Sequence, residues 1–282
     1  MVRVNEIKDK FQNTLIDSLC MNEILSIWRN WVIKEILQKS LVSYFLDGNF
    51  IVGDLQIKKI NLLISHLLSN QPVQYFFGYS YFKNLKLNVN HNVLIPRPET
   101  EELVDLVIKK SKKSSFNTIL DIGTGSGCIA IALKKALDVN MIALDVSTSS
   151  IDQAIQNADK QGVDILFQTM DILDIENYKF LPKLDIIVSN PPYVTTLDVP
   201  KDSVIYAEPK NAIFVPDNDP LVFYKFILKL AQTNLNIGGK IFFEINPKFI
   251  NRLLNLIKQN GYFNIAIHKD FFEKKRFIVV SS

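Results

Sequence analysis

The feature that most constrains this chain is a regular alternation of apolar strands and helices, which begins at Thr118 and continues to the C-terminus. Short runs of aliphatic residues alternate with longer segments in which apolar residues recur every three or four positions. The predicted strands are 118–122, 141–144, 165–167, 185–188, 240–243, 265–267 and 277–280, and the predicted helices are 128–137, 149–161, 221–235 and 249–259. Strands that alternate with helices pair in parallel, so we predict an α/β fold with a doubly wound, mostly parallel, seven-stranded sheet.

Length, charge and cysteine content narrow the class of protein. The chain has 282 residues, 48% of them hydrophobic, which suits one large domain and one small domain. The formal net charge of +3 is too balanced to predict a nucleic-acid-binding protein by itself. Cys20 and Cys128 form neither a disulfide framework nor a metal-binding spacing. No uncharged apolar run approaches the ~20 residues that span a bilayer, and the charged start differs from a signal peptide. We therefore expect a cytoplasmic protein.

The first part of the chain has a different pattern. Apolar residues recur at helical spacing from Ile7 to about Leu68, which predicts a small helical bundle. Aromatic residues and the alternating segment 85–89, with a turn at Lys83 and Asn84, then predict a β-hairpin. We expect three parts: an all-α domain over 1–72, a β-hairpin linker over 73–95 and the α/β domain over 96–282.

A glycine-rich loop follows the first strand of the alternating region and opens a helix. It begins after Asp121 and consists of Gly123, Thr124, Gly125, Ser126 and Gly127. Alternate glycines let the backbone approach a ligand closely, and the helix N-terminus presents free N–H groups. The spacing is not the dinucleotide fingerprint, and the loop lacks the lysine of a phosphate-binding loop. Because Asp121 would repel a phosphate and attract an ammonium group, a ligand with an amino-acid end fits better.

Two further acids stand at the ends of the next two predicted strands. Asp145 lies where a carboxylate binds a ribose diol, and Asp171 can accept a hydrogen bond from an adenine amino group, with Ile172 beside it to pack on the ring. Each acid alone is more often a helix cap or a solvated turn residue. Three acids at successive strand ends beside a glycine loop favour a nucleoside site.

The fourth predicted strand ends in Asn190, Pro191, Pro192 and Tyr193. The prolines cannot donate to a strand ladder, so the strand stops at Asn190. The Asn190 side-chain oxygen and the Pro191 carbonyl can converge on one NH2 group, with Tyr193 as a flat wall. The alternative is a strand followed by a proline turn that Asn190 caps. Upstream, Arg97 stands between two prolines, which hold its backbone extended.

The glycine loop, the acids and the Asn-Pro-Pro-Tyr motif together resemble class I S-adenosylmethionine-dependent methyltransferases that act on nitrogen. The segments 72–78 and 95–101 and the pair Glu208–Pro209 make the chain similar to one family, the release factor glutamine methyltransferases. The resemblance extends from about Pro72 to the C-terminus. The chain departs from the family in its first forty residues and at 215–220, where the family has a glycine-rich turn.

This resemblance implies a Rossmann-like fold, S-adenosylmethionine as cofactor, and transfer of its methyl group to the side-chain nitrogen N5 of glutamine. The glutamine is that of the Gly-Gly-Gln motif in peptide-chain release factors, which act in translation termination. The N-terminal domain would dock this partner, the enzyme would be a cytoplasmic monomer, and no metal is required. The implied catalytic residues are Asn190, Pro191, Pro192 and Tyr193, and these four with Arg97 and Glu99 would bind substrate. The implied cofactor residues are Asp121, Gly123, Thr124, Gly125, Ser126, Gly127, Asp145, Asp171, Ile172 and Asn190.

Two other functions stay open at this point. An adenine-N6 methyltransferase acting on DNA or RNA would use the same Asn-Pro-Pro-Tyr pocket, but it needs a basic face and a target-recognition insertion. A non-catalytic subunit would bind the cofactor and a partner without turnover, which an intact Asn-Pro-Pro-Tyr motif disfavours.

Overall fold

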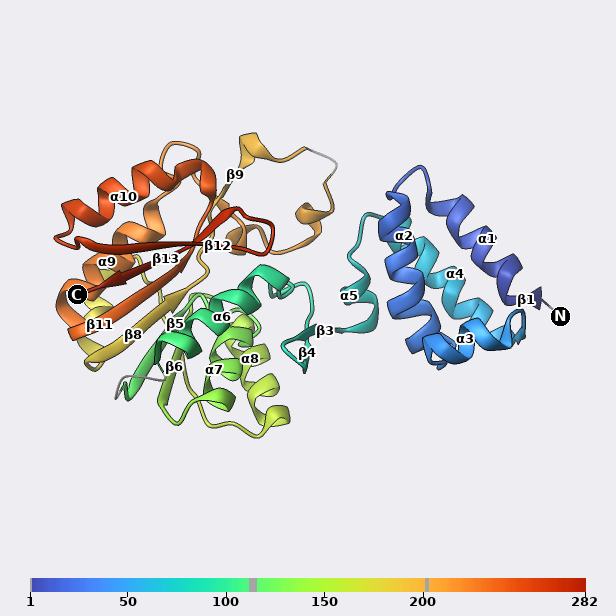
Figure 1. Ribbon diagram of the computed structural model, residues 1–282, viewed down its shortest axis with the longest axis horizontal. Coiled ribbons are helices and arrows are strands. Elements are labelled where there is room, and N and C mark those ends of the chain that lie inside the picture. The colour runs from blue at the N-terminus through green and yellow to red at the C-terminus, as the bar shows by residue number, and fades with distance from the viewer. Residues whose placement is uncertain (1, 112–115, 201–202) are drawn as a thin grey trace. The chain divides into compact units, whose positions relative to one another are not determined.

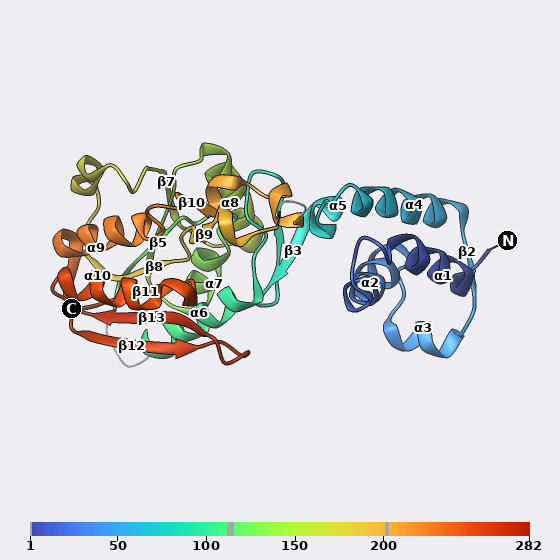
Figure 2. The same cartoon turned by 90° about the horizontal axis from the view of Figure 1, so that it is seen from above.

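The computed structural model describes residues 2–111, 116–200 and 203–282. The chain divides into two compact units, Met1–Phe77 and Gly78–Ser282 (Figures 1 and 2). Each unit has its own hydrophobic core. None of the helices in these described ranges is both long enough and apolar enough to cross a membrane.

The first unit is a small helical bundle. Its α-helices are α1 (Val4–Leu15), α2 (Met21–Ile27), α3 (Leu41–Asp47), α4 (Asp54–Leu68) and α5 (Val73–Phe77), and a π-helical segment spans Trp28–Ile36. The short strands β1 (Val2–Arg3) and β2 (Ile51–Val52) pair antiparallel. Trp28 is fully buried in this core, and its Nε1 donates to the hydroxyl of Tyr44 at 3.2 Å. The tryptophan therefore has a structural role.

The segment between the bundle and the sheet begins as a helix, where the sequence predicted part of a hairpin. Val73, Phe76 and Phe77 are at helical spacing, and all three pack against the first unit's core. The hairpin follows as β3 (Tyr79–Phe82) and β4 (Leu85–Asn88). Lys83 and Asn84 join its strands with φ angles of 44° and 62°, as a tight hairpin turn requires.

The hairpin belongs by contacts to the second unit. Asn157, on helix α8 (Thr148–Gln161), accepts from the N–H of Asn88 at 2.8 Å and donates to the Asn88 carbonyl at 3.0 Å. The same side-chain amide donates to the carbonyl of Ser126 in the glycine loop at 2.9 Å. One buried asparagine thus ties the hairpin to the loop that opens the site.

The second unit is built on a seven-stranded sheet of order β12-β13-β11-β8-β5-β6-β7. Its strands are β5 (Thr118–Ile122), β6 (Asn140–Asp145), β7 (Leu166–Thr169), β8 (Leu184–Ser189), β11 (Leu235–Glu244), β12 (Asn264–Lys269) and β13 (Lys275–Ser281). All neighbours pair in parallel except β13, which is antiparallel to both β11 and β12. The prediction of a doubly wound, mostly parallel sheet is confirmed.

Helices cover both faces of this sheet, as Figure 1 shows. Helices α6 (Pro98–Ser111), α7 (Cys128–Ala136) and α8 lie over one face, and α9 (Val222–Asn234) and α10 (Ile250–Gln259) lie over the other. The apolar residues of alternate sheet positions form one core cluster with each helical layer.

The strand order places a ligand-binding crevice between β5 and β8. The chain moves outward from β5 to β6 and β7, then returns to β8 on the other side of β5. Ligands of open α/β sheets bind beyond the carboxyl ends of the strands at such a switch point. The glycine loop follows β5 and Asn190 follows β8, so both predicted motifs lie at this crevice.

Candidate active site

The glycine loop requires glycine for two different reasons. Gly125 and Gly127 have φ angles of 53° and 81°, which side chains rarely adopt. A Cβ at Gly127 would lie 3.0 Å from Cδ1 of Ile131 and 3.2 Å from Cβ of Ala154, whereas a Cβ at Gly125 would meet nothing within 4 Å. Gly127 therefore permits close packing of α7 and α8, and Gly125 leaves room beside the cavity that it lines.

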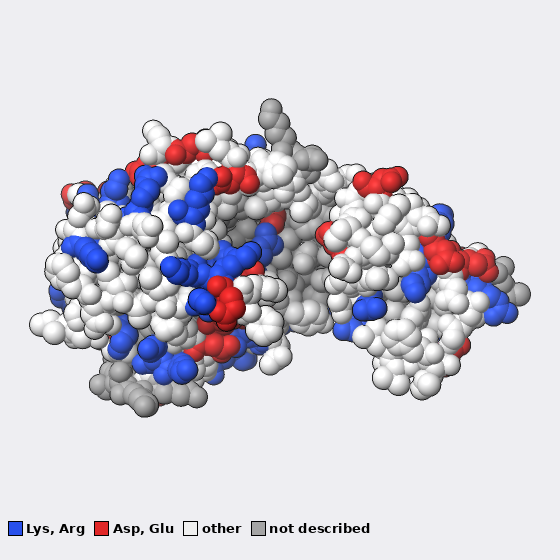
Figure 3. Space-filling model, turned by 45° about the horizontal axis from the view of Figure 1, so that its top comes forward, with Lys and Arg blue, Asp and Glu red and all other residues white. Residues whose placement is uncertain are grey.

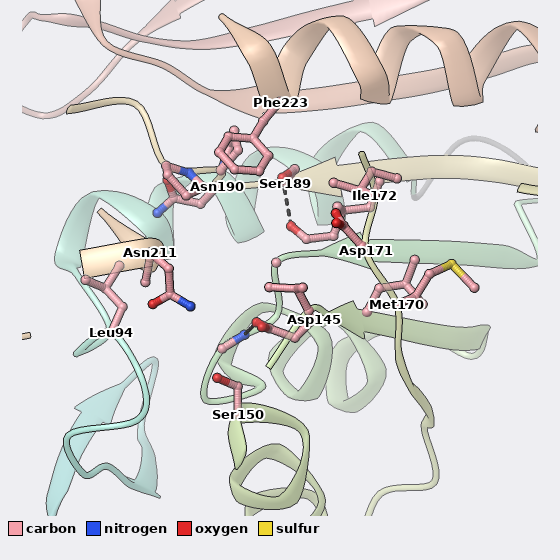
Figure 4. Close-up of a pocket in the computed structure, with 18 of the residues that line it drawn as sticks. Leu94, Asp145, Ser150, Met170, Asp171, Ile172, Ser189, Asn190, Asn211 and Phe223 are labelled. Atoms are coloured by element: carbon pink, nitrogen blue, oxygen red, sulfur yellow. Dashed lines mark hydrogen bonds between the residues drawn. The ribbon is translucent and has the colours of Figure 1, made fainter. Parts of the chain in front are cut away.

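A cavity with about 800 Å³ of empty space, part of it open to solvent, lies at the carboxyl ends of β5, β6, β7 and β8. Figure 4 shows Asn190 and Phe223 at the top of the view and Leu94 and Asn211 at the left, with Asp145, at the end of β6, and Asp171, just beyond β7, opposite them. The cavity thus combines apolar walls with a few convergent polar groups.

Asp145 and Asp171 both line this cavity, as the sequence predicted. The carboxylate of Asp145 accepts from the N–H of Gly125 at 2.9 Å and from the N–H of Ser147 at 3.0 Å. Burial raises its pKa, and these backbone hydrogen bonds oppose that shift. Asp171 lies two residues beyond the end of β7, is exposed, and accepts from the N–H of Leu173 at 2.9 Å.

Asp121 has a different position from its two neighbours. It is fully buried, and its Oδ2 accepts from the hydroxyl of Thr124 at 2.7 Å. Alternate residues of a strand face opposite sides of a sheet, and Ile122 is the β5 residue that lines the cavity. Asp121 therefore supports the glycine loop from beneath, and burial raises its pKa to about 7. Thr124 and Ser126 are likewise buried within the loop.

The Asn-Pro-Pro-Tyr motif separates this cavity from a second, smaller one. Asn190, Pro191 and Pro192 line both cavities, and Tyr193 lines only the second. The Nδ2 of Asn190 donates to the hydroxyl oxygen of Thr100 at 3.0 Å. The motif therefore stands where two ligands could meet, one from each side.

Arg97 lines the second cavity and forms an ion pair there. Its guanidinium bonds the carboxylate of Glu208, which also accepts from the N–H of Ile95 at 3.0 Å. The side chain of Glu208 is 3% exposed and that of Arg97 is 34% exposed, so the carboxylate is buried while the guanidinium still reaches water. Glu99, the other acidic residue predicted here, lines neither cavity.

The unusual turn at 215–220 braces the segment after the motif. Val215 ends β10 (Phe214–Val215), which pairs in parallel with β9 (Val194–Thr195). The carboxylate of Asp217 accepts from the N–H and the hydroxyl of Thr196, at 2.9 and 2.8 Å. Asp217 thus fastens the segment after the motif to this turn.

Sequence reasoning missed several residues of the site. Leu94, Asn211 and Phe223 line the first cavity, and Thr100 and Glu244 are bonded behind the motif. Two of these had a usable signal: Glu244 is an acid that ends a buried strand, and Thr100 lies in the segment 95–101 that carries the family resemblance. The others come from segments far away in sequence, and their residue types are ordinary for loops and helix starts.

S-adenosylmethionine fits these residues. The open space beside Gly125 admits a ligand against the backbone, Asp145 stands at the ribose position, and Ile172 provides an apolar surface for a ring. Among the described residues, no group of three or more His, Cys, Asp or Glu is placed to hold a metal. These lining residues suit the nucleoside part of the cofactor.

Comparison with known proteins agrees with this geometry. Residues 100–206 match the family model described as "Methyltransferase small domain". A solved methyltransferase from Pyrococcus furiosus superposes with a TM-score of 0.53 at 17% identity, covering 77% of this chain and 96% of that one. This likeness concerns the fold alone. The matched family model supports a methyltransferase with S-adenosylmethionine as its cofactor.

Curated relatives identify the family. A release factor glutamine methyltransferase of Flavobacterium psychrophilum is 39% identical over 89% of this chain and 89% of its own length. A protein of the same name from Bacteroides thetaiotaomicron is 36% identical over 88% of this chain and 89% of its own. Because such identity extends over nearly all of both sequences, the chain belongs to the release factor glutamine methyltransferase family.

Proposed function

We propose that this enzyme methylates the side-chain nitrogen N5 of the glutamine in the Gly-Gly-Gln motif of peptide-chain release factors. The observation that carries the proposal is the position of Asn190 between the two cavities. Its Nδ2 is bonded to Thr100, so its Oδ1 is the atom left to accept a proton from an amide. One cavity would hold the cofactor and the other the glutamine side chain.

The proposed chemistry must overcome the low nucleophilicity of an amide nitrogen. Its lone pair is delocalised into the carbonyl, so it is a poor nucleophile. We expect the Asn190 Oδ1 and the Pro191 carbonyl to accept its two protons, which would orient the nitrogen and stabilise positive charge as it develops. The cofactor supplies the methyl group on its sulfonium. Tyr193 forms a wall of the acceptor cavity, Pro192 keeps the loop rigid, and the released proton passes to solvent.

Other parts of the site would have simpler roles. Asp145 and Asp171 would bind the ribose and the adenine amino group, with Ile172 on the ring. Arg97, held by Glu208, would shape the entrance for the protein substrate. Glu99 would contact the substrate outside the cavities.

We also propose that the helical unit docks the release factor, and that the enzyme acts as a cytoplasmic monomer. The charge distribution of the enzyme supports a protein substrate over a nucleic acid. Figure 3 shows Lys and Arg interspersed with Asp and Glu on the face drawn, and the net charge of the chain is +3, whereas a nucleic-acid-binding face is strongly basic. Light scattering of the purified chain, alone and with a release factor, tests the monomer.

A methyl-transfer assay with labelled S-adenosylmethionine tests the proposed reaction. Three acceptors are compared: a release factor, the same factor with its Gly-Gly-Gln glutamine replaced, and a mixture of DNA and RNA. Label on the intact factor alone supports the proposal. Label on nucleic acid alone would assign the chain to adenine methylation, and bound cofactor without any label would indicate a non-catalytic subunit.

A further inference from the structure

Glu244 is a buried carboxylate with no part in the chemistry described so far. It ends β11, is 1% exposed, and lies behind the Asn-Pro-Pro-Tyr motif. Its Oε2 accepts from the hydroxyl of Thr100 at 2.8 Å, and its Oε1 accepts from the hydroxyl of Tyr193 at 3.0 Å. A carboxylate that is removed from water needs hydrogen-bond donors in the protein, so the burial of Glu244 depends on these two hydroxyl groups.

With Glu244 ionised, the protons of this network allow one arrangement. An ionised carboxylate only accepts hydrogen bonds, so the hydroxyl of Thr100 must give its single proton to Glu244. Its oxygen is then left only with lone pairs toward Asn190. Only the NH2 end of the Asn190 carboxamide can satisfy those lone pairs, and this is the observed contact of 3.0 Å.

We infer that Glu244 and Thr100 are positioning residues for methyl transfer, which hold the Asn190 carboxamide with its oxygen directed to the acceptor nitrogen. The inference rests on the proposed function. If the carboxamide rotated by half a turn, its NH2 would meet the NH2 of the substrate, and two donors would face each other. The network therefore favours the orientation of the Asn190 carboxamide that can bind the substrate amide over the flipped orientation, which has nearly the same shape.

The surroundings of Glu244 act on its ionisation in both directions. Burial raises its pKa, while the hydrogen bonds from Thr100 and Tyr193 and the charge of Arg276 oppose that shift. Tyr224, from α9, donates to the backbone carbonyl of Glu244 at 2.8 Å and leaves the carboxylate to its two hydroxyl partners. Thr100 comes from the first turn of α6, so the relay joins three separate segments of the unit.

Four variants test the relay. Thr100→Val keeps the side-chain shape and removes the hydroxyl. We expect kcat to fall by about 10²-fold, because nothing then orients the Asn190 oxygen toward the substrate nitrogen. Thr100→Ser restores a hydroxyl and should recover kcat to within about threefold of the wild type. Glu244→Gln has one acceptor and one donor end, so it can orient only one hydroxyl and should lower kcat by about tenfold. Tyr224→Phe is the matched control, because it removes a hydroxyl that contacts only the backbone of Glu244.

The control measurements separate orientation from folding and binding. The melting temperature and the Kd for S-adenosylmethionine, from calorimetry, should change little in Thr100→Val, and the KM for the release factor should change less than kcat. If Thr100→Val fails to fold, Thr100→Ala, which also removes the hydroxyl, carries the test. A Thr100→Val enzyme that folds and keeps the kcat of the wild type would overturn the inference.

A second readout does not depend on turnover. The side-chain NH2 signals of Asn190, assigned in nitrogen-15 NMR spectra by comparison with Asn190→Ala, should shift in Thr100→Val and Glu244→Gln and stay in place in Tyr224→Phe. Unmoved signals in both relay variants would refute the relay. If these signals move while no release factor is methylated even by the wild type, the relay stands and the proposed substrate fails.

Discussion

The cofactor side and the acceptor side of this site are built in different ways. On the cofactor side, Asp145 bonds Gly125 only 20 residues away, and the other groups follow successive strands in chain order. On the acceptor side, Asn190 bonds Thr100 across 90 residues, and Thr100 bonds Glu244 across 144. The predicted cofactor residues are therefore placed by local backbone geometry, although distant residues complete the cavity wall, whereas amide recognition depends on side chains that only the fold brings together.

Removal of Asn190 should separate the two sides most clearly. Asn190→Ala deletes the oxygen that accepts an amide proton, and we expect kcat to fall by about 10²–10³-fold, the usual effect of losing one preorganised polar group at a reaction centre. Calorimetry should give a Kd for S-adenosylmethionine within about threefold of the wild type, because the other lining residues remain. Near-normal turnover would show that Asn190 does not orient the acceptor.

The buried acid beneath the glycine loop should influence stability through pH. Burial raises the pKa of Asp121 from 3.8 to about 7, so between these values the folded chain keeps a proton that the unfolded chain has lost. Stability from this group is thus present at low pH and declines as pH rises through that window, by roughly 2–3 kcal/mol between pH 5 and 8.

Asp121→Asn tests this sign, because asparagine keeps an acceptor for Thr124 and cannot ionise. Its urea denaturation midpoint should exceed that of the wild type at pH 8, and the difference should shrink toward pH 5. If the midpoints of the two proteins differed by the same amount at pH 5 and pH 8, other groups in the fold would be stabilising the ionised Asp121 carboxylate.

Loss of Asp145 should affect only the cofactor side. We expect Asp145→Ala to raise the Kd for S-adenosylmethionine by about 10–100-fold, since a hydrogen bond to a charged group contributes about 1.5–3 kcal/mol. At saturating cofactor, the KM for the release factor should stay near the wild-type value. A large rise in that KM with unchanged cofactor affinity would reverse the assignment of the two sides.

Arg97 offers the smallest effect, on the acceptor side. Arg97→Ala leaves the buried carboxylate of Glu208 with only the N–H of Ile95, and we expect the KM for the release factor to rise by about tenfold through a loosened cavity wall. Lys83→Ala is the control, because it removes a more exposed ion pair with Asp105 and should change little. Equal effects of the two variants would count against a special role for Arg97.

Much of the fold was predictable because its signals are local. Strand and helix periodicity, the glycine loop and the proline stop after Asn190 each depend on a few neighbouring residues. The prediction failed where neighbours were ambiguous. The aromatic segment 73–77 was taken as part of a hairpin, but Val73, Phe76 and Phe77 also match a helix, and burial against the first unit's core decides for it.

The site divides in the same way. Asp145, Asp171 and Ile172 line the predicted cavity because parallel strands bring their carboxyl ends to one edge. Asp121 is in the same motif but faces the other side of the sheet, and one residue of register decides between lining a cavity and supporting a loop. In the sequence, Glu208 was notable only as part of the family resemblance. Its ion pair with Arg97 could not be predicted, because the two residues are 111 positions apart.

The sequence by itself determined the alternating fold, the cofactor loop and the methyl-acceptor motif, because backbone conformation and strand periodicity are set within a few residues. Only the tertiary structure decided which way the Asn190 carboxamide points. That orientation depends on the single proton of Thr100 and the buried charge of Glu244, and neither group is near Asn190 until the sheet and α6 have packed together.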